Sequence, residues 1–167
     1  REEGQLPIYY NHFNTGRPAP NETAFNYVSA YTDLKNSPKF PFGFGLSYTT
    51  FDYTDLKLSK NKINDAETIE VSFNLTNSGK FEGNEVVQLY LRDKVGSVVR
   101  PIIELKDFQK IHLNAGETKM IQFKIDKEKL SFYNQQLVWG AEPGDFDLMI
   151  GSSSSDIRLR AAFELIK

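Results

Sequence analysis

The feature that most constrains this chain is a period-two alternation of apolar and polar residues, which recurs through its last two-thirds. In the stretch 69–76, every second residue is Ile, Val, Phe or Leu, and the residues between them are polar. Neighbouring side chains of a strand leave opposite faces of the sheet, so this spacing predicts strands with one buried face. The apolar positions are Ile69, Val71, Phe73 and Leu75, then Leu56 and Leu58, Val87, Leu89 and Leu91, Ile111 and Leu113, Ile121, Phe123 and Ile125, Phe146, Leu148 and Ile150, and Ile157, Leu159, Ala161, Phe163 and Leu165.

Turn-forming residues separate these segments at Asn77–Lys80, Asn114–Glu117 and Glu142–Asp145. Such residues either tolerate positive φ or set the backbone for a turn. Short strands divided by tight turns predict an all-β fold, an antiparallel β-sandwich. The one helical signal lies in 126–130, where Asp126 can cap a single turn.

Residues 1–50 follow a different pattern. Leu6–Tyr10 predicts one short strand, which Pro7 restricts to a sheet edge or a strand start. The Asn-, Pro- and Gly-rich stretch that follows is too long for a plain loop in a compact domain. Its aromatic side chains need a surface to cover, which is the sandwich, a preceding domain or both. We therefore divide the chain into a strand-and-linker segment, 1–50, and a sandwich, 51–167. The aromatic residues are Tyr9, Tyr10, Phe13, Phe25, Tyr27, Tyr31, Phe40, Phe42, Phe44 and Tyr48.

Composition excludes several functions. The chain has no cysteine, so disulfides, thiolate metal sites and thiol catalysis are excluded. A net charge of −2 without a basic stripe argues against nucleic-acid binding. No apolar run approaches the ~20 residues of a membrane-spanning helix. No signal-peptide pattern is present, and we expect more protein upstream of Arg1 in the natural gene.

The residue types that carry catalysis or bind metals show no arrangement typical of a site. His12 and His112 lack companions at ligand spacing, so we predict a structural hydrogen bond for the first and a solvated ring for the second. Glu104 and Asp107 are the least ordinary acids, yet we expect surface or loop positions for both rather than a glycosidase acid/base pair. The other acids considered fall at exposed strand or turn positions: Glu70, Glu82, Glu85, Glu117, Asp126, Glu128, Asp145 and Asp147.

Three further segments have a functional and a structural interpretation. The serine run 152–155 lacks a G-x-S-x-G elbow and a partner histidine, so it predicts a hairpin loop. The two glycines of 42–45 do not follow a strand or open a helix, which argues against a phosphate loop. Trp139 or Tyr133 could form a sugar-stacking platform, although a single tryptophan in a sandwich more often belongs to the core or its rim. We predict no catalytic residue, no metal site and no cofactor in this chain, and assign no substrate-binding residue.

Several motifs of the chain together resemble one enzyme family. The segment 41–51, PFGFGLSYTTF, resembles the sequence that joins the last two domains of glycoside hydrolase family 3 enzymes. The further matches keep the family's order, and the likeness is strongest to bacterial periplasmic β-glucosidases. Asp107 and Gly96 depart from it, standing where the family usually has glycine and alanine. The matching segments are 4–12 and 14–18, similar to the end of the family's α/β sandwich domain, and 76–79, 83, 85–90, 97–101, 104–110, 115–118 and 142–151 in the sandwich.

The resemblance implies an immunoglobulin/fibronectin type III-like sandwich, preceded by the terminal strand of an α/β domain and a linker. It implies the non-catalytic, structural C-terminal domain of a β-glucosidase that releases terminal β-D-glucosyl residues with retention. The family's aspartate nucleophile and glutamate acid/base would lie upstream of Arg1. The implied partners are the catalytic domains of the same polypeptide, and the implied location is periplasmic or secreted. A carbohydrate-binding module or an adhesive sandwich is the alternative. The expected domain-interface residues are Tyr10, Arg17, Phe40, Phe42, Phe44, Tyr48 and Phe51.

Overall fold

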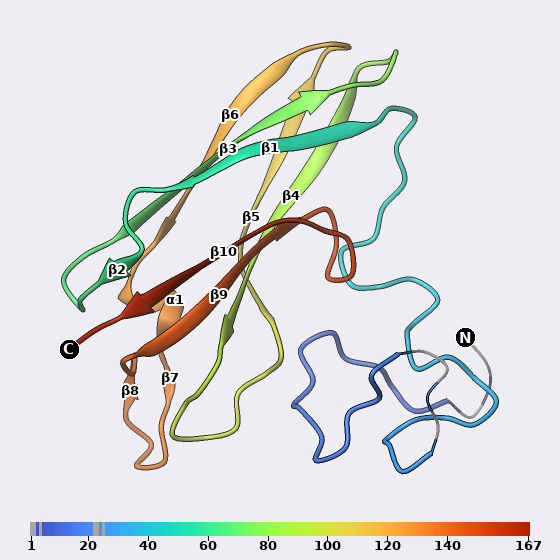
Figure 1. The fold of residues 1–167 in the computed structure, drawn as a ribbon. Helices are drawn as coiled ribbons and strands as arrows, with labels where there is room; N and C mark the ends of the chain where they lie inside the picture. The colour runs from blue at the N-terminus through green and yellow to red at the C-terminus, as the bar shows by residue number, and fades with distance from the viewer. Residues whose placement is uncertain (1–2, 4, 22–23, 25) are drawn as a thin grey trace.

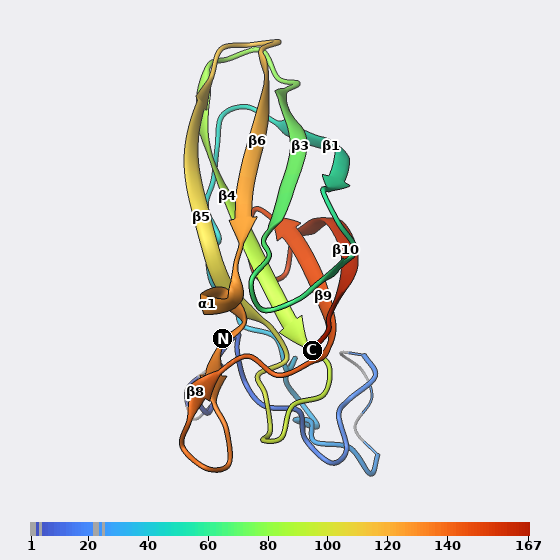
Figure 2. The same ribbon diagram turned by 90° about the vertical axis from the view of Figure 1, so that its left-hand side faces the viewer.

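The computed structural model describes residues 3, 5–21, 24 and 26–167, and it confirms the predicted antiparallel β-sandwich (Figure 1). Arg1 and Phe25 lie outside the described residues. A three-stranded sheet, in the order β1-β3-β6, faces a five-stranded sheet, in the order β2-β10-β9-β4-β5. The view in Figure 2 shows the two layers side by side, with α1 at one end.

The three-stranded sheet follows the predicted alternation. It consists of β1 (Phe51–Leu58), β3 (Ile69–Asn77) and β6 (Thr118–Ile125), all antiparallel. Every second residue of β3 from Ile69 onward is buried. In β1 the pairing shifts between Thr54 and Lys57, around Asp55 with a φ of 58°. This bulge explains why Leu56 and Leu58 are only partly buried against the core.

The five-stranded sheet is antiparallel except where β2 joins β10 in parallel. Its strands are β2 (Lys62–Ile63), β10 (Ile157–Leu165), β9 (Gly144–Gly151), β4 (Gly83–Asp93) and β5 (Glu104–Leu113). Leu89, Leu148 and Ile150 of this sheet have no exposed surface. In the opposite sheet, Leu75 is also fully buried and Phe73 is 1% exposed. Each such side chain contributes roughly 1.5–3 kcal/mol by leaving water, so the core between the sheets is the main source of stability.

A single helical turn and a small hairpin follow β6. The turn is α1 (Lys127–Leu130), and Asp126 caps it as predicted, because its side chain accepts a hydrogen bond of 3.1 Å from the Lys129 backbone N–H. Strands β7 (Phe132–Tyr133) and β8 (Trp139–Gly140) then form a hairpin that projects beyond the sheets (Figures 1 and 2).

Leu6–Tyr10, expected to be a strand of the preceding domain's sheet that packs irregularly or pairs with a neighbouring chain when that sheet is missing, joins no ladder among the described residues. A strand needs a neighbour for its backbone groups, and the Leu6 N–H instead donates to the Tyr31 hydroxyl at 2.9 Å. In the described part of residues 3–50, extended pairing is limited to isolated bridges, Phe13 with Pro101 and Pro18 with Ser29. The segment gathers as irregular coil at one end of the sandwich (Figure 1).

Candidate functional site

The N-terminal segment covers part of the outer face of the five-stranded sheet. Tyr90 of β4 points away from the core by alternation with Leu89, yet none of its surface is exposed. Its ring meets Tyr10 edge-on, with 6.0 Å between centroids, and Tyr10 stacks on Phe42 at 4.2 Å. Burial raises the pKa of the Tyr90 hydroxyl. Two predicted interface residues, Tyr10 and Phe42, therefore lie against this sheet.

Gln88 is the polar centre of this contact. Its amide nitrogen donates to the backbone carbonyls of Gly43, at 3.2 Å, and Ser152, at 2.6 Å, while its Oε1 accepts from the Tyr90 hydroxyl. The Ser154 N–H donates to the Phe42 carbonyl at 2.9 Å. The serine run thus lies in the loop between β9 and β10, as predicted, and its backbone holds the linker.

Gly43 is required by this arrangement for two reasons. Its φ is +79°, a conformation that side-chain-bearing residues rarely adopt. A Cβ at this position would also lie 2.1 Å from the Gln88 Oε1. The glycine lets the linker approach the buried amide closely.

A second anchor fixes the end of the linker. The Thr49 hydroxyl donates to Oδ1 of Asn77 at 2.6 Å, and Asn77 has no exposed surface. The Asn77 amide nitrogen donates to the Phe81 and Leu113 carbonyls at 2.8 and 3.1 Å. A buried amide is tolerated only when its polar atoms are bonded, so this network ties the linker to the β3–β4 turn and to the end of β5.

The linker leaves large apolar side chains exposed just before the Gly43 anchor and between it and the Thr49 anchor. Leu46 is 91% exposed and Tyr48 is 97% exposed. Phe44 is about half exposed and packs on the exposed Phe40, with 5.4 Å between ring centroids. We call Phe40, Phe44, Leu46 and Tyr48 the open linker surface. A cluster of exposed apolar residues on a fixed backbone is typical of an interaction surface.

The remaining predicted interface residues lie elsewhere. Phe51 is 8% exposed and begins β1, so it belongs to the sandwich core. Arg17 is exposed in the N-terminal coil, where its carbonyl accepts from the Ser29 N–H at 2.7 Å. The structure does not bring either of them into the open linker surface.

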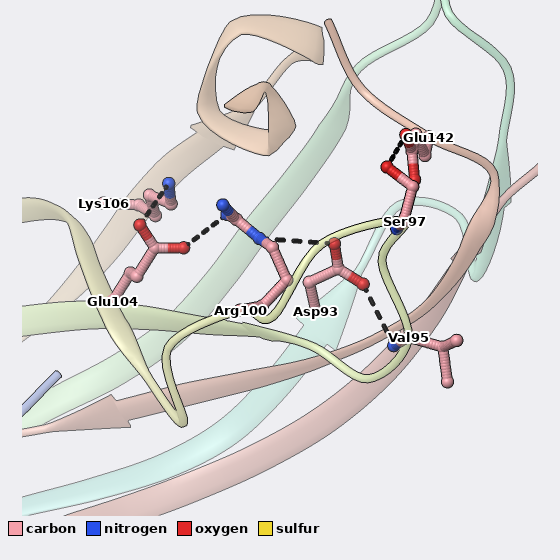
Figure 3. Close-up of polar contacts among 7 residues, drawn as sticks. All are labelled: Asp93, Val95, Ser97, Arg100, Glu104, Lys106 and Glu142. Atoms are coloured by element: carbon pink, nitrogen blue, oxygen red, sulfur yellow. Dashed lines mark hydrogen bonds and ion pairs between the residues drawn. The ribbon is translucent and has the colours of Figure 1, made fainter. Parts of the chain in front are cut away.

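A buried ion-pair cluster holds the loop 94–103 between β4 and β5 (Figure 3). The Arg100 side chain is only 13% exposed, and its Nη2 donates to Glu104 at 2.6 Å. Its Nε lies 3.6 Å from Oδ2 of Asp93, and its guanidinium lies 4.1 Å from the centroid of the Phe132 ring. Lys106 lies 3.4 Å from the other oxygen of Glu104. Both oxygens of Glu104 therefore face cations, which is a structural arrangement and not that of a general acid.

Near its start the same loop is held by hydrogen bonds to two carboxylates. Oδ1 of Asp93 accepts from the Val95 N–H at 3.2 Å, and Glu142 accepts from both the backbone N–H and the hydroxyl of Ser97, at 2.8 and 2.6 Å. Burial raises the pKa of Asp93, and the charge of Arg100 opposes that rise. Arg100 lies in the family-like segment 97–101, but its burial depends on long-range contacts with Phe132 and Glu104.

A third polar cluster lies in a hollow of about 690 Å³ beside the linker. The Tyr53 hydroxyl donates to Glu85 at 2.7 Å, and burial raises the pKa of that carboxyl. Arg158 donates two hydrogen bonds of 2.7 Å to Asp156 and lowers the pKa of that carboxyl. Each acid thus has its own donor within the protein.

Comparison with known proteins agrees with the observed sandwich. The fibronectin type III-like domain family matches residues 85–154. A periplasmic β-glucosidase of Salmonella typhimurium is 46% identical over 166 residues, which are 99% of this chain and 22% of that protein. The β-glucosidase BoGH3A of Bacteroides ovatus is 46% identical over 138 residues, 82% of this chain and 18% of that protein. This chain carries a fibronectin type III-like domain of glycoside hydrolase family 3.

A solved structure agrees with this assignment. A β-glucosidase from Listeria innocua, crystallised in complex with gluconolactone, matches with a TM-score of 0.91 and 41% identity. The match covers 98% of this chain and 23% of that one. This chain therefore spans only about a fifth of the length of the two curated relatives, 22% of the Salmonella protein and 18% of the Bacteroides protein.

Within the fibronectin type III-like domain, the other candidate residues have structural contacts. Asp107 lies in β5, partly buried, and forms an ion pair of 2.7 Å with Lys129. His112 is half exposed, with its Nε2 3.7 Å from Glu82. In the N-terminal coil, His12 contacts the Phe13 carbonyl at 2.8 Å. Among the described residues, no three His, Cys, Asp or Glu side chains are grouped to hold a metal ion. No helix in the described part of the chain is long and apolar enough to cross a membrane.

Proposed function

We propose that this chain is the non-catalytic, structural C-terminal domain of a β-glucosidase. The enzyme would release terminal β-D-glucosyl residues with retention, using catalytic groups in other domains of the same polypeptide. The supporting observation is the open linker surface, whose apolar side chains are exposed although the backbone beside them is anchored at Gln88 and Asn77. Exposed apolar area on a fixed backbone favours docking on a partner domain, because the surface loses little entropy on binding.

The loop 94–103 supports the same role. Its Ile102 N–H donates to the His12 carbonyl at 3.0 Å, and Pro101 bridges to Phe13. The loop therefore contacts the segment that resembles the end of the family's α/β domain. The proposed location is periplasmic or secreted. It is supported by the name of one relative, the periplasmic β-glucosidase of Salmonella typhimurium, and cell fractionation with an antibody to this domain would test it.

An activity assay tests the first part of the proposal. We expect the isolated chain to release no nitrophenol from p-nitrophenyl β-glucoside above the buffer rate, because each clustered carboxylate is occupied by a structural donor. Turnover that co-purifies with the chain and persists in an independent preparation would refute the non-catalytic assignment.

A pair of matched substitutions tests the docking surface. In the full-length enzyme, we expect Leu46→Ser to shorten the half-life of activity at elevated temperature several-fold. Leu137→Ser is the control, because this leucine is also more than three-quarters exposed, at 81%, but lies on the β7–β8 hairpin. Equal half-lives for the two variants would contradict docking through the linker.

A further inference from the structure

A second aromatic surface lies away from the linker, on the hairpin formed by β7 and β8 (Figure 1). The rings of Tyr133 and Trp139 are in contact there at a tilted angle, with 5.0 Å between ring centroids and 57° between ring planes. Both are exposed by about half or more of their surface. Trp139 lines a shallow, open hollow of about 390 Å³, which is bordered by the segment 65–68, α1 and β8. This volume falls at the lower end of small-molecule sites, which measure roughly 300–1,000 Å³.

The indole ring of Trp139 is held in one orientation. Its N–H lies 3.2 and 3.3 Å from the two carboxylate oxygens of Glu128 in α1. The polar atom of the ring is thereby satisfied within the protein, and the surface that remains available to a ligand is apolar. A ring fixed before binding also loses little conformational entropy when a ligand stacks on it.

The rest of the lining offers carboxylate acceptors, each of which already has a donor within the protein. Asp65 is paired with Lys127, and Glu67 is paired with Lys60. Asp126 is turned toward the first N–H groups of α1, where a negative charge is favourable. Glu128 accepts from the Trp139 N–H. An anionic ligand would meet four carboxylates, and a cationic ligand would compete with the donors that these carboxylates already have. The lining therefore favours a neutral ligand that is rich in hydroxyl groups.

We propose that the hollow bordered by Trp139, Glu128 and Asp65 binds a neutral β-linked gluco-oligosaccharide. In β-glucopyranose the ring substituents are equatorial, so the axial C–H groups form a flat apolar face that fits an indole ring. The hydroxyl groups at its edge can donate to the carboxylates of the lining. This site is separate from the open linker surface, and neither proposal depends on the other.

The test uses a property of the sequence, because Trp139 is the only tryptophan of the chain. Its fluorescence therefore reports on this hollow alone. Titration of the whole chain with cellotetraose or laminaritetraose is expected to change the emission saturably, with half-saturation on the order of 1 mM for one stacked ring and a few hydrogen bonds. A strictly linear response at tenfold higher concentration would overturn the proposal.

Variants that keep the reporter separate binding from nonspecific effects. Asp65→Ala and Tyr133→Ala are expected to raise the half-saturation concentration at least threefold, while Leu137→Ala, at the tip of the same hairpin, leaves it unchanged. In calorimetry, Trp139→Ala is expected to abolish the heat of binding. If that variant loses the circular dichroism of the folded chain, Asp65→Ala decides the question, and unchanged binding by Asp65→Ala overturns the proposal.

A final comparison distinguishes the ligand class. Tetramethylammonium chloride is expected to leave the emission unchanged relative to sodium chloride of equal ionic strength. A saturable response to it at lower concentration than to cellotetraose would show that the hollow binds organic cations and would overturn the assignment to sugars.

Discussion

At the scale of single residues, Gly43 carries the tightest constraint on the linker. It combines positive φ with a close approach to the Gln88 side chain. We expect Gly43→Ala to lower the free energy of unfolding by about 2–3 kcal/mol, because the strained backbone and the contact each contribute about 1 kcal/mol or more. Urea denaturation followed by circular dichroism measures the effect.

Two other glycines of the chain separate these contributions. Gly116 has a φ of +77° with nothing within 4 Å of an added Cβ, so Gly116→Ala measures backbone strain alone, about 1 kcal/mol. Gly45 has open space, so Gly45→Ala is expected to be neutral or slightly stabilising. If Gly43→Ala cost no more than Gly116→Ala, the close contact with Gln88 would be unimportant.

Glu85 gives a prediction about pH. Burial raises its pKa above the ordinary value of 4.5, so the folded chain binds this proton more tightly than the unfolded chain does. The stability due to this group is complete below pH 4.5 and is lost as the pH rises through the raised pKa. Glu85→Gln keeps an acceptor for the Tyr53 hydroxyl and removes the titration. We therefore expect the Tm of this variant, relative to the parent, to rise between pH 4.5 and neutrality.

Glu117 is the control of opposite sign. Its backbone hydrogen bond from Asn114 is the main cause that lowers its pKa below 4.5. The stability due to Glu117 is present above that pH and is lost as the pH falls through the lowered pKa. The Tm of Glu117→Gln relative to the parent should therefore fall as the pH rises through the lowered pKa to 4.5, and should change little from there to neutrality. The same sign for both variants would contradict this assignment of the two environments.

At the scale of elements, the loop 94–103 depends on one buried cation. Arg100→Met would leave the Asp93 carboxylate buried beside no opposite charge, and we expect a loss of about 3 kcal/mol. The double variant Asp93→Asn/Arg100→Met should recover at least half of that loss, because the unpaired charge is gone. Urea denaturation of the three proteins measures the coupling.

An exposed pair provides the comparison for Arg100. Lys62 and Glu164 lie 2.9 Å apart, and both are about half exposed. Lys62→Met should cost less than about 1 kcal/mol, as is usual for surface ion pairs. A similar cost for Arg100→Met would mean that water screens the cluster and that its burial has little effect.

At the scale of the whole molecule, the chain consists of a layered sandwich and an irregular N-terminal coil. Lys35 and Lys39 lie exposed in that coil, whereas Lys57, Lys119 and Lys124 lie in paired strands. Cleavage requires local opening, so we expect trypsin to cut first after Lys35 or Lys39 and to leave a resistant fragment that begins in the linker. Mass spectrometry of a time course identifies the cuts. Early cleavage after Lys119 would contradict this order of stability.

The alternation of apolar residues determined the sandwich. Ile69, Val71, Phe73 and Leu75 have one buried face wherever their strand pairs, so local periodicity sufficed to predict the strands and the core. Asp126 was likewise predictable as a helix cap, because capping involves only neighbours in sequence. The resemblance to the family also rested on sequence motifs alone.

Tertiary structure decided what covers the second face of the five-stranded sheet. Gln88 and Tyr90 stand at positions that alternation assigns to solvent, and residues from far along the chain, Gly43 at Gln88 and Tyr10 at Tyr90, cover them. The absence of a strand at Leu6–Tyr10 has the same origin, because a strand exists only where a neighbour accepts its hydrogen bonds. Local patterns specify which face of an element is apolar, and long-range contacts decide which surfaces meet.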